Sequence, residues 1–498
     1  MQFVASLPLQ RHSRCNTGPR CYSRSRVLCC ASKHRPSADL SSSPPPVPES
    51  AHESNGRFRR NVVSVPHLSD YLSDLVSNKN PARRRPEVQQ HFVSDHELVR
   101  GNIIVNDQDN EEHGSDEYFL RAGPRQTAYY RRENVRAAIV TCGGLCPGIN
   151  CTIREIVRCL ELEYGVKKIF GIRNGYQGCY KSHWIELNAG LVDNIHKSPG
   201  TLLGTSRGGF DLCKIVDALE TRSINQLYVI GGDGTICGAH KIVQEVMRRK
   251  LRLSVAVVPK TIDNDIETVS STFGFATAVE ESQRAISAAA IEARDFPNGV
   301  AIVQLMGRNS GFIAMHATLA SREVDACLIP EIPFPVHGKG GVLDYINELV
   351  REKGHAIVVV AEGAGSDDYD GSSEIGAYLR DEVKEFAKKN WENRVSMKYL
   401  NPTYSVRAVP TIASDRIFCT LLAHDSVHGV FSGLTGFVTG PIHSTLAYIP
   451  LSRIAGRQKK VDPSDLLWLK LMSSTGQPDW TKAKAERREM GVKAESGS

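Results

Sequence analysis

Long hydrophobic runs are absent from this chain of 498 residues. No apolar stretch approaches the ~20 residues that a membrane-spanning helix requires, so we expect a soluble protein without a membrane partner. Apolar residues make up 41% of the chain and charged residues 23%, which is the balance of an ordinary globular protein. The length exceeds what one compact core accommodates, and two or more folded units are therefore predicted.

Paired metal-ligand spacings are absent from the thirteen cysteines. Four lie within the first thirty residues, and the others show no recurring pairs of the kind found in zinc ribbons. Most are therefore expected to be small buried hydrophobic residues. Cys142, Cys146 and Cys151 lie in or beside one glycine-rich turn, and two interpretations stay open for them. A Cys146–Cys151 disulfide would distort the turn and act as a redox switch, whereas the alternative is three inert side chains.

Acidic residues are absent from residues 1–38, and the net charge of +6 is concentrated at this end. Residues 1–60 carry ten Lys or Arg against three Asp or Glu, a balance of +7, which leaves residues 61–498 near −1. The main part of the chain therefore gives no sign of a nucleic-acid-binding surface. A basic, Ser-rich and acid-poor start is typical of an organelle transit peptide. We predict a chloroplast transit peptide and linker over residues 1–55, with a disordered basic tail as the alternative.

Short apolar runs alternate with helix-like segments from residue 136 onward. This alternation predicts parallel sheets covered by helices on both faces. Residues 61–133 are polar and irregular, with one helical candidate at 68–75, and the chain turns polar again after Met472. The predicted strands are 136–140, 168–171, 226–230, 254–258, 299–305 and 355–361, and the clearest predicted helices are 239–250 and 276–293.

Two glycine-rich turns follow predicted strands, at residues 142–150 and 231–235. Glycine lets backbone N–H groups approach an anion closely, and the N-terminus of the following helix adds favourable partial charge. Asp233 lies between two glycines of the second turn, where it is placed to hold Mg²⁺ through oxygen or water contacts. These turns predict phosphate binding, and a purely structural turn is the alternative for each.

The heptapeptide Pro-Lys-Thr-Ile-Asp-Asn-Asp at 259–265 directly follows a predicted strand. A chain that leaves a strand in extended form points alternate side chains the same way. Thr261, Asp263 and Asp265 are then predicted to converge at the carboxyl end of a sheet, where open α/β folds hold their ligands. The alternative is a turn whose Asp and Asn side chains bond their own backbone.

Seven motifs occur together in a fixed order between about residues 135 and 450. In this order and spacing the sequence resembles the 6-phosphofructokinases, and its long N-terminal extension is similar to that of the plant plastidic ATP-dependent form. The motifs lie at residues 143–150, 204–207, 231–235, 259–265, 306–308, 361–363 and 404–407.

The resemblance implies an α/β fold of two Rossmann-like three-layer domains with the active site in the cleft between them. An ATP-binding domain would comprise residues 135–275 plus 406–456, and a fructose 6-phosphate-binding domain residues 276–405. An N-terminal extension at 56–134 and a polar C-terminal tail at 473–498 would flank them. The implied reaction is the Mg²⁺-dependent phosphorylation of fructose 6-phosphate by ATP at its 1-hydroxyl. The implied assembly is a homo-oligomer, by resemblance a tetramer.

The resemblance also implies roles for individual residues. Asp263 would act as general base beside Thr261 and Asp265, and Arg308 would stabilise charge on the transferring phosphoryl group. Asp233 would hold the metal. The nucleotide would be lined by Gly144, Arg207, Gly208, Gly232, Asp233, Gly234 and Thr235. The sugar phosphate would contact Thr261, Ile262, Asp263, Met306, Gly307, Arg308, Glu362, Tyr404 and Arg407, with Lys398 as a further candidate.

Two positions give opposite indications of the phosphoryl donor. Gly234 leaves room for the inner phosphate of ATP, whereas pyrophosphate-dependent members typically carry Asp there. Lys260 matches the pyrophosphate users, because many bacterial ATP-dependent members have Gly at that position. We give Gly234 more weight, since an extra carboxylate excludes a nucleotide directly. A pyrophosphate-dependent enzyme and a catalytically silent regulatory subunit are the alternatives.

Two further positions depart from the bacterial members of the family. Gly299 stands where many have an Arg that reaches the substrate of a neighbouring subunit, and Leu145 stands where many have Asp. The resemblance therefore does not extend to the subunit-crossing contact or to the allosteric behaviour of those enzymes.

Overall fold

The computed structural model describes residues 61–84, 92–103, 117–365, 369, 371 and 373–482. The chain divides into a first unit, Met1–Phe58, and a second unit, Arg59–Ser498. The predicted transit peptide and linker at 1–55 lie outside the described residues. All residues that the structure describes belong to the second unit. None of the helices among its described residues has both the length and the apolar character to cross a membrane.

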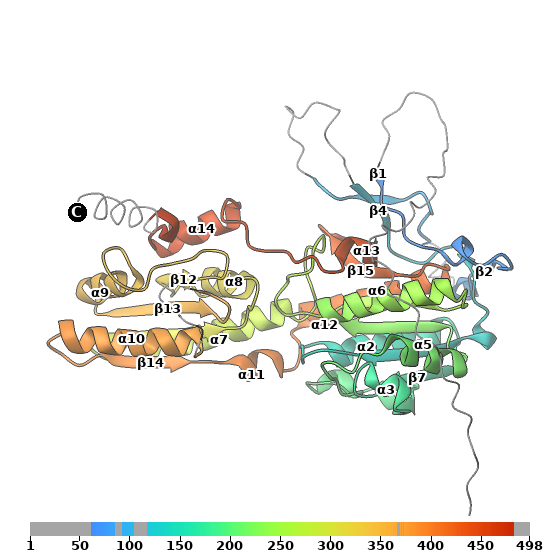
Figure 1. Ribbon diagram of the computed structural model, residues 1–498, viewed down its shortest axis with the longest axis horizontal. Coiled ribbons are helices and arrows are strands. Elements are labelled where there is room, and N and C mark those ends of the chain that lie inside the picture. Colours follow the sequence, from blue (N-terminus) through green and yellow to red (C-terminus); the bar gives the residue numbers. More distant parts are fainter. Residues whose placement is uncertain are drawn as a thin grey trace, which may run out of the picture. The chain divides into compact units, whose positions relative to one another are not determined.

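The larger sheet has ten strands among the described residues (Figure 1). Its centre runs β15-β10-β9-β6-β7, and all four of these neighbouring pairs are parallel. The short strands at both ends of the sheet are mostly antiparallel. In spatial order the strands are β1 (Asn61–Val62), β4 (Glu117–Arg121), β16 (Thr445–Pro450), β15 (Phe437–Ile442), β10 (Ser254–Pro259), β9 (Gln226–Gly231), β6 (Arg136–Thr141), β7 (Lys168–Ile172) and β8 (Trp184–Glu186), with β3 (Leu98–Arg100) on β4.

Both faces of the larger sheet are buried, which explains why its central strands are almost entirely apolar. Alternate residues of β10 enter different cores. Ala256 and Val258 belong to one core together with residues of α12 (Ala413–Phe431). Val255 and Val257 belong to the other, together with residues of α6 (Asp233–Arg248). Helix α2 (Ile149–Arg158) packs beside α12, and α5 (Leu212–Thr221) beside α6.

The smaller sheet has four strands in the order β12-β13-β11-β14, and all its pairs are parallel. Helices α7 and α8 pack against each other beside it, as do α9 and α10 (Figure 1). Because the strands are parallel, their carboxyl ends share one edge. The bounds are β11 (Gly299–Leu305), β12 (Ala326–Leu328), β13 (His355–Ala361), β14 (Ser396–Leu400), α7 (Phe275–Arg294), α8 (Phe312–Ser321), α9 (Val342–Lys353) and α10 (Ile375–Asn390).

All six predicted strands are confirmed, and β11 and β13 have the predicted bounds. The expectation for residues 61–133 was wrong in part. The helical candidate at 68–75 is a short 3₁₀ turn, Leu68–Asp70, which is capped by the His67 ring and the Asp70 carboxylate. Strands β1, β3 and β4 of this region join the larger sheet instead, and β2 (Asn78–Lys79) pairs with β5 (Thr127–Ala128). Strands of two to five residues are too short to show an alternating pattern.

The expected polar tail at 473–498 was wrong for the part that the structure describes. Helix α14 (Leu466–Thr475) continues to Thr475. Beyond it, the Gln477 side chain accepts a hydrogen bond from the Cys327 backbone N–H at 2.7 Å and donates one to the Cys327 carbonyl at 3.4 Å. Trp480 is only 2% exposed and packs edge-on against Tyr345. Residues 473–482 are therefore part of the packed fold.

Candidate active site

The heptapeptide at 259–265 leaves β10 and turns at once. Thr261 Oγ accepts a hydrogen bond from the Asp263 N–H at 3.1 Å and donates one to an Asp265 carboxylate oxygen at 3.2 Å. Asn264 has a positive φ of 55°. The predicted extended conformation was wrong. The segment is a locally bonded turn, as in the alternative, but the Thr261 hydroxyl makes these bonds, which the alternative assigned to Asp and Asn side chains. The turn still brings Thr261 and Asp265 together.

Asp263 keeps an unsatisfied oxygen in this turn. Its Oδ1 is buried and has no hydrogen-bond partner among the described residues. Burial first, and then the negative charges of Asp265 and Glu362, raise the pKa of Asp263 to about 7, against the opposing charge of Lys260. A carboxylate with a pKa near neutrality and a free oxygen is suited to accept a proton from a bound molecule.

Residues 306–308 and Glu362 leave neighbouring strands of the smaller sheet side by side. The register pairs Leu305 of β11 with Ala361 of β13. Beyond that pair, the Glu362 N–H donates to the Leu305 carbonyl at 2.8 Å and the Gly363 N–H to the Gly307 carbonyl at 3.1 Å. A Cβ at Gly363 would lie 1.8 Å from the Arg308 carbonyl oxygen, so only glycine permits this approach.

A hydrogen bond joins this edge of the smaller sheet to the turn after β10. Ser310 Oγ donates to the Asp263 carbonyl at 3.3 Å. The charge of Glu362 also acts on Asp263. The ends of β10, β11 and β13 therefore meet around Asp263.

Two arginines contribute positive charge near Glu362. Burial raises the pKa of Glu362, while the Gly307 backbone amide and the guanidinium groups of Arg308 and Arg407 oppose the shift. Arg407 ends α11 (Thr403–Arg407), which follows β14, and its guanidinium lies over the ring of Tyr404. The Tyr404 side chain is 75% exposed.

Lys398 lies in a different environment from Arg407. Its ammonium group pairs with Glu292 at 3.0 Å and lies over the Phe296 ring. These contacts do not support the expectation that Lys398 joins Arg407 in a phosphate site.

A cavity of about 440 Å³ lies beside the two glycine-rich turns. Gly234 has open space where a Cβ would be. The Lys260 ammonium group is buried in the wall and donates to the Gly144 carbonyl at 2.8 Å, and burial lowers its pKa. All seven residues predicted to line a nucleotide border this cavity: Gly144, Arg207, Gly208, Gly232, Asp233, Gly234 and Thr235.

The cavity wall also contains residues that the sequence analysis missed. Tyr176 and Phe210 form an edge-to-face pair with ring centroids 5.3 Å apart. The Tyr176 hydroxyl donates to the Thr235 carbonyl at 2.9 Å. Lys241 of α6 adds a positive charge. Tyr176 and Phe210 each lie next to glycines in the sequence. Such a pattern predicts a turn, but it does not predict where the aromatic side chain points.

Asp233 and Asp265 form the donor set that would suit a divalent cation. Asp233 is the first residue of α6, and its charge adds to the burial that raises the pKa of Asp265. Carboxylate oxygens, completed by phosphate oxygens, are the ligands that Mg²⁺ prefers.

The three cysteines near the first turn are free and buried. Cys146 Sγ donates to the Phe273 carbonyl, whereas Cys151 Sγ contacts Thr411 Oγ. Burial raises the pKa of both thiols, as it does for Cys142, and protonated buried thiols react slowly. This environment favours the inert interpretation over the redox switch.

Gly299 has no room for a side chain. A Cβ at this position would lie 1.8 Å from the Ala293 carbonyl oxygen. An Arg cannot replace it without a shift of the backbone at the start of β11.

The fold and the site define an α/β protein with a cavity at the glycine-rich ends of parallel strands. A family model described as Phosphofructokinase matches residues 136–430, and the chain belongs to this family. It is 47% identical over 436 residues to ATP-dependent 6-phosphofructokinase 7 of Arabidopsis thaliana, covering 84% of this chain and 89% of the relative. It is 48% identical to the chloroplastic ATP-dependent 6-phosphofructokinase 4 of the same plant, in an alignment that covers 84% of this chain and 82% of the relative.

Solved structures of the family share the fold at lower identity. A pyrophosphate-dependent phosphofructokinase from Marinobacter aquaeolei aligns with a TM-score of 0.59 at 21% identity, covering 66% of this chain and 86% of that one. Pichia pastoris phosphofructokinase in the T-state aligns with a TM-score of 0.57 at 23% identity, and the alignment covers 64% of this chain and 35% of the Pichia chain.

Proposed function

We propose that the chain is an ATP-dependent 6-phosphofructokinase, which transfers the terminal phosphoryl group of ATP to the 1-hydroxyl of fructose 6-phosphate. One observation carries the choice of donor: the cavity continues from the two glycine-rich turns to the Tyr176–Phe210 pair. Pyrophosphate has no apolar part, whereas a nucleoside presents a ring that packs well against aromatic side chains. The relatives named ATP-dependent 6-phosphofructokinase support the same donor.

Gly234 and Lys260 give opposite indications of the phosphoryl donor, and their surroundings in the cavity show which of the two is informative. The space around Gly234 is open, so a carboxylate there would extend toward the phosphates of a bound nucleotide. Lys260 is held by the Gly144 carbonyl in the wall of the cavity, where its charge attracts any polyphosphate. Lys260 is therefore compatible with ATP.

In the proposed mechanism, Asp263 removes the proton of the 1-hydroxyl as that oxygen attacks the phosphoryl group. Its raised pKa and its free Oδ1 support this role. The Thr261 hydroxyl fixes the turn by bonding the Asp263 N–H. Arg308 stabilises negative charge that develops on the transferring group, because its exposed guanidinium lies close enough to influence Glu362.

The remaining predicted residues bind the acceptor in this proposal. Glu362 accepts hydrogen bonds from sugar hydroxyls, and Arg407 with Tyr404 binds the 6-phosphate. Met306, Gly307 and Ile262 shape the sugar pocket. Mg²⁺, when bound, neutralises charge on the donor phosphates, and Asp233 with Asp265 would hold it.

We also assign domains on this basis. The ATP-binding domain comprises 135–275 plus 406–456, which is supported by the pairing of β15 and β16 into the larger sheet. The fructose 6-phosphate-binding domain comprises 276–405, which contains all four strands of the smaller sheet. A homotetramer is proposed from the resemblance alone, and its test is the mass in solution measured by light scattering.

The donor is tested with Gly234→Asp and the matched control Gly234→Asn, which has the same size without the charge. An acidic residue is favourable in the first turn of a helix, so the Asp variant is expected to fold. We expect Gly234→Asp to lower kcat/KM for ATP at least 100-fold, and Gly234→Asn to lower it much less. Thermal unfolding of both variants checks the fold.

Assays of the unsubstituted protein with ATP or pyrophosphate separate the alternatives. Turnover with pyrophosphate but not ATP would make the chain a pyrophosphate-dependent enzyme. Absence of turnover with both donors, in a folded protein that still binds fructose 6-phosphate, would favour the regulatory subunit.

A further inference from the structure

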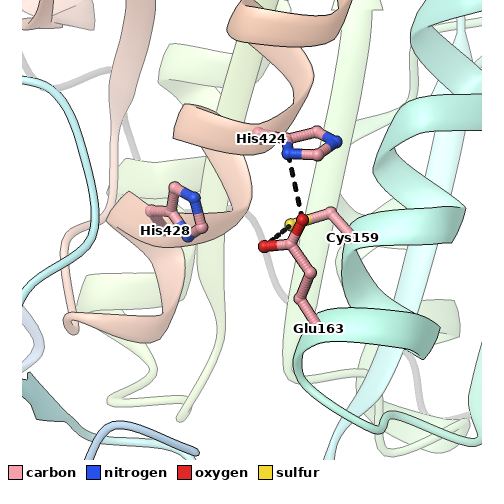
Figure 2. Close-up of side chains that lie close together, drawn as sticks. All are labelled: Cys159, Glu163, His424 and His428. Carbon is pink, nitrogen blue, oxygen red and sulfur yellow. Dashed lines mark hydrogen bonds and ion pairs between the residues drawn. The ribbon is translucent and has the colours of Figure 1, made fainter. Parts of the chain in front are cut away.

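Four side chains with metal-binding groups lie together at the contact between α2 and α12 (Figure 2). Cys159 and Glu163 begin and end a π-helical turn that continues α2, while His424 and His428 lie on α12. One potential ligand atom of each residue lies within 4.8 Å of those of the other three. None of the four lines the cavity assigned to the nucleotide.

The spacing of these residues explains why they face one another. Each pair is separated by four positions, so both of its members project from one side of their helical segment. Helices α2 and α12 pack along each other, which brings the two pairs face to face. Single π-helical turns occur frequently at functional sites.

Outer partners orient both imidazole rings. His428 Nδ1 lies 2.8 Å from the Tyr164 hydroxyl, which leaves Nε2 for another ligand. His424 Nε2 lies 3.4 Å from the Glu155 carboxylate, while its Nδ1 faces Glu163 at 3.3 Å. A carboxylate or hydroxyl on the second ring nitrogen is the usual support of a metal-bound His.

We propose that Cys159, Glu163, His424 and His428 form a zinc site that fastens α2 to α12. One sulfur, one carboxylate oxygen and two imidazole nitrogens are ligands that Zn²⁺ accepts in a tetrahedral shell. Side-chain rotations that move the ligand atoms by roughly 1 Å bring them to the separations of a tetrahedral shell, in which the metal lies about 2.0 Å from N and 2.3 Å from S. Cys159 binds as the thiolate, and its proton passes to solvent.

The competing interpretation is an ion pair without metal. A protonated His424 between the carboxylates of Glu155 and Glu163 satisfies the same distances. The two interpretations differ in Cys159, which is a thiolate ligand in the first and donates a hydrogen bond from its thiol to Glu163 Oε2 at 3.7 Å in the second.

Titration with Co²⁺ as a spectroscopic substitute for Zn²⁺ distinguishes them. The reduced, metal-free, full-length chain without a His tag is expected to bind one equivalent and to show a thiolate-to-cobalt charge-transfer band that Zn²⁺ abolishes by displacement. Cys159→Ser should abolish the band. Cys213→Ser, which changes an exposed cysteine of α5, is the matched control and should keep it.

Thermal unfolding supplies a second readout. Zn²⁺ at 100 times its Kd should raise the Tm of the unsubstituted chain by roughly 3 °C, and should not raise that of Cys159→Ser. Should Cys159→Ser fail to fold, Glu163→Gln replaces it as the test variant. This variant keeps the Cys159 thiolate, so the charge-transfer band should be retained, while the affinity for Co²⁺ should fall at least tenfold. A band that survives Cys159→Ser, equal zinc shifts in both proteins, or no bound equivalent would overturn the proposal in favour of the ion pair or of adventitious binding at other thiols.

Discussion

Replacement of Asp263 by Asn should remove catalysis and, above neutral pH, stabilise the fold. The variant keeps the size of the side chain and removes its ionisation. A general base contributes roughly 10²–10⁴-fold to the rate, so kcat should fall by at least 100-fold, with a smaller change in the KM for fructose 6-phosphate. In the unsubstituted enzyme, kcat/KM should decline as pH falls below about 7, because protonated Asp263 cannot accept the proton.

The expected gain in stability follows from the shifted pKa. Burial and neighbouring carboxylates raise the pKa of Asp263 from 3.8 to about 7. Roughly three pH units at 1.36 kcal/mol per unit correspond to about 4 kcal/mol. With an unfolding entropy of ~2.1 cal/mol/K per residue over roughly 400 residues, this corresponds to a rise in Tm of about 4–5 °C.

The sign of the effect depends on pH. Below about pH 4 the carboxyl is protonated in both the folded and the unfolded chain, so the variant and the parent should be equally stable. Between pH 4 and 7 the unfolded chain ionises Asp263 first, and the parent loses stability relative to the variant as pH rises. The full difference is expected above pH 7.

Differential scanning calorimetry at pH 5 and pH 8, together with steady-state kinetics, tests this reasoning. Asp295→Asn is the matched control, because Asp295 is exposed at the end of α7, and it should show no pH-dependent gain. A Tm difference that is the same at both pH values would refute the buried, raised pKa. Retention of more than a tenth of kcat by Asp263→Asn would remove Asp263 as the base.

Two further predictions concern the ends of the chain. Trp480→Ala should destabilise the fold by roughly 3–5 kcal/mol because it leaves a cavity in the packed C-terminal segment, and thermal unfolding measures this loss. The control Phe296→Ala changes an exposed residue and should have little effect. Equal Tm values for Trp480→Ala and the unsubstituted chain would contradict the packing of the C-terminal segment. Residues 1–60 fused to a fluorescent protein should accumulate in chloroplasts, as the leader composition and the chloroplastic relatives suggest, and a cytosolic distribution would contradict the predicted chloroplast transit peptide.

Local patterns in the sequence determined the central strands and the residues of the nucleotide cavity. Strands such as 299–305 are almost entirely apolar because both faces of their sheet are buried, and that property can be recognised in a short window. The glycine-rich turns at 142–150 and 231–235 were recognisable for a similar reason. Phosphate binding there depends on backbone conformation and on the helix that follows directly, both of which are local.

Tertiary structure alone decided how these segments meet. The proximity of the turn at 261–265 to Glu362 depends on contact between different sheets. Strand β4 enters the larger sheet only because β16, far along the chain, offers it an edge.

The cluster at Cys159, Glu163, His424 and His428 illustrates the limit most clearly. Each pair has helical spacing, but neither pair alone supplies more than two of the four ligands. The packing of α2 against α12 joins them across more than 200 positions of sequence. A sequence window records which residues share a helix face, whereas the partner of that face is chosen by burial of the whole core.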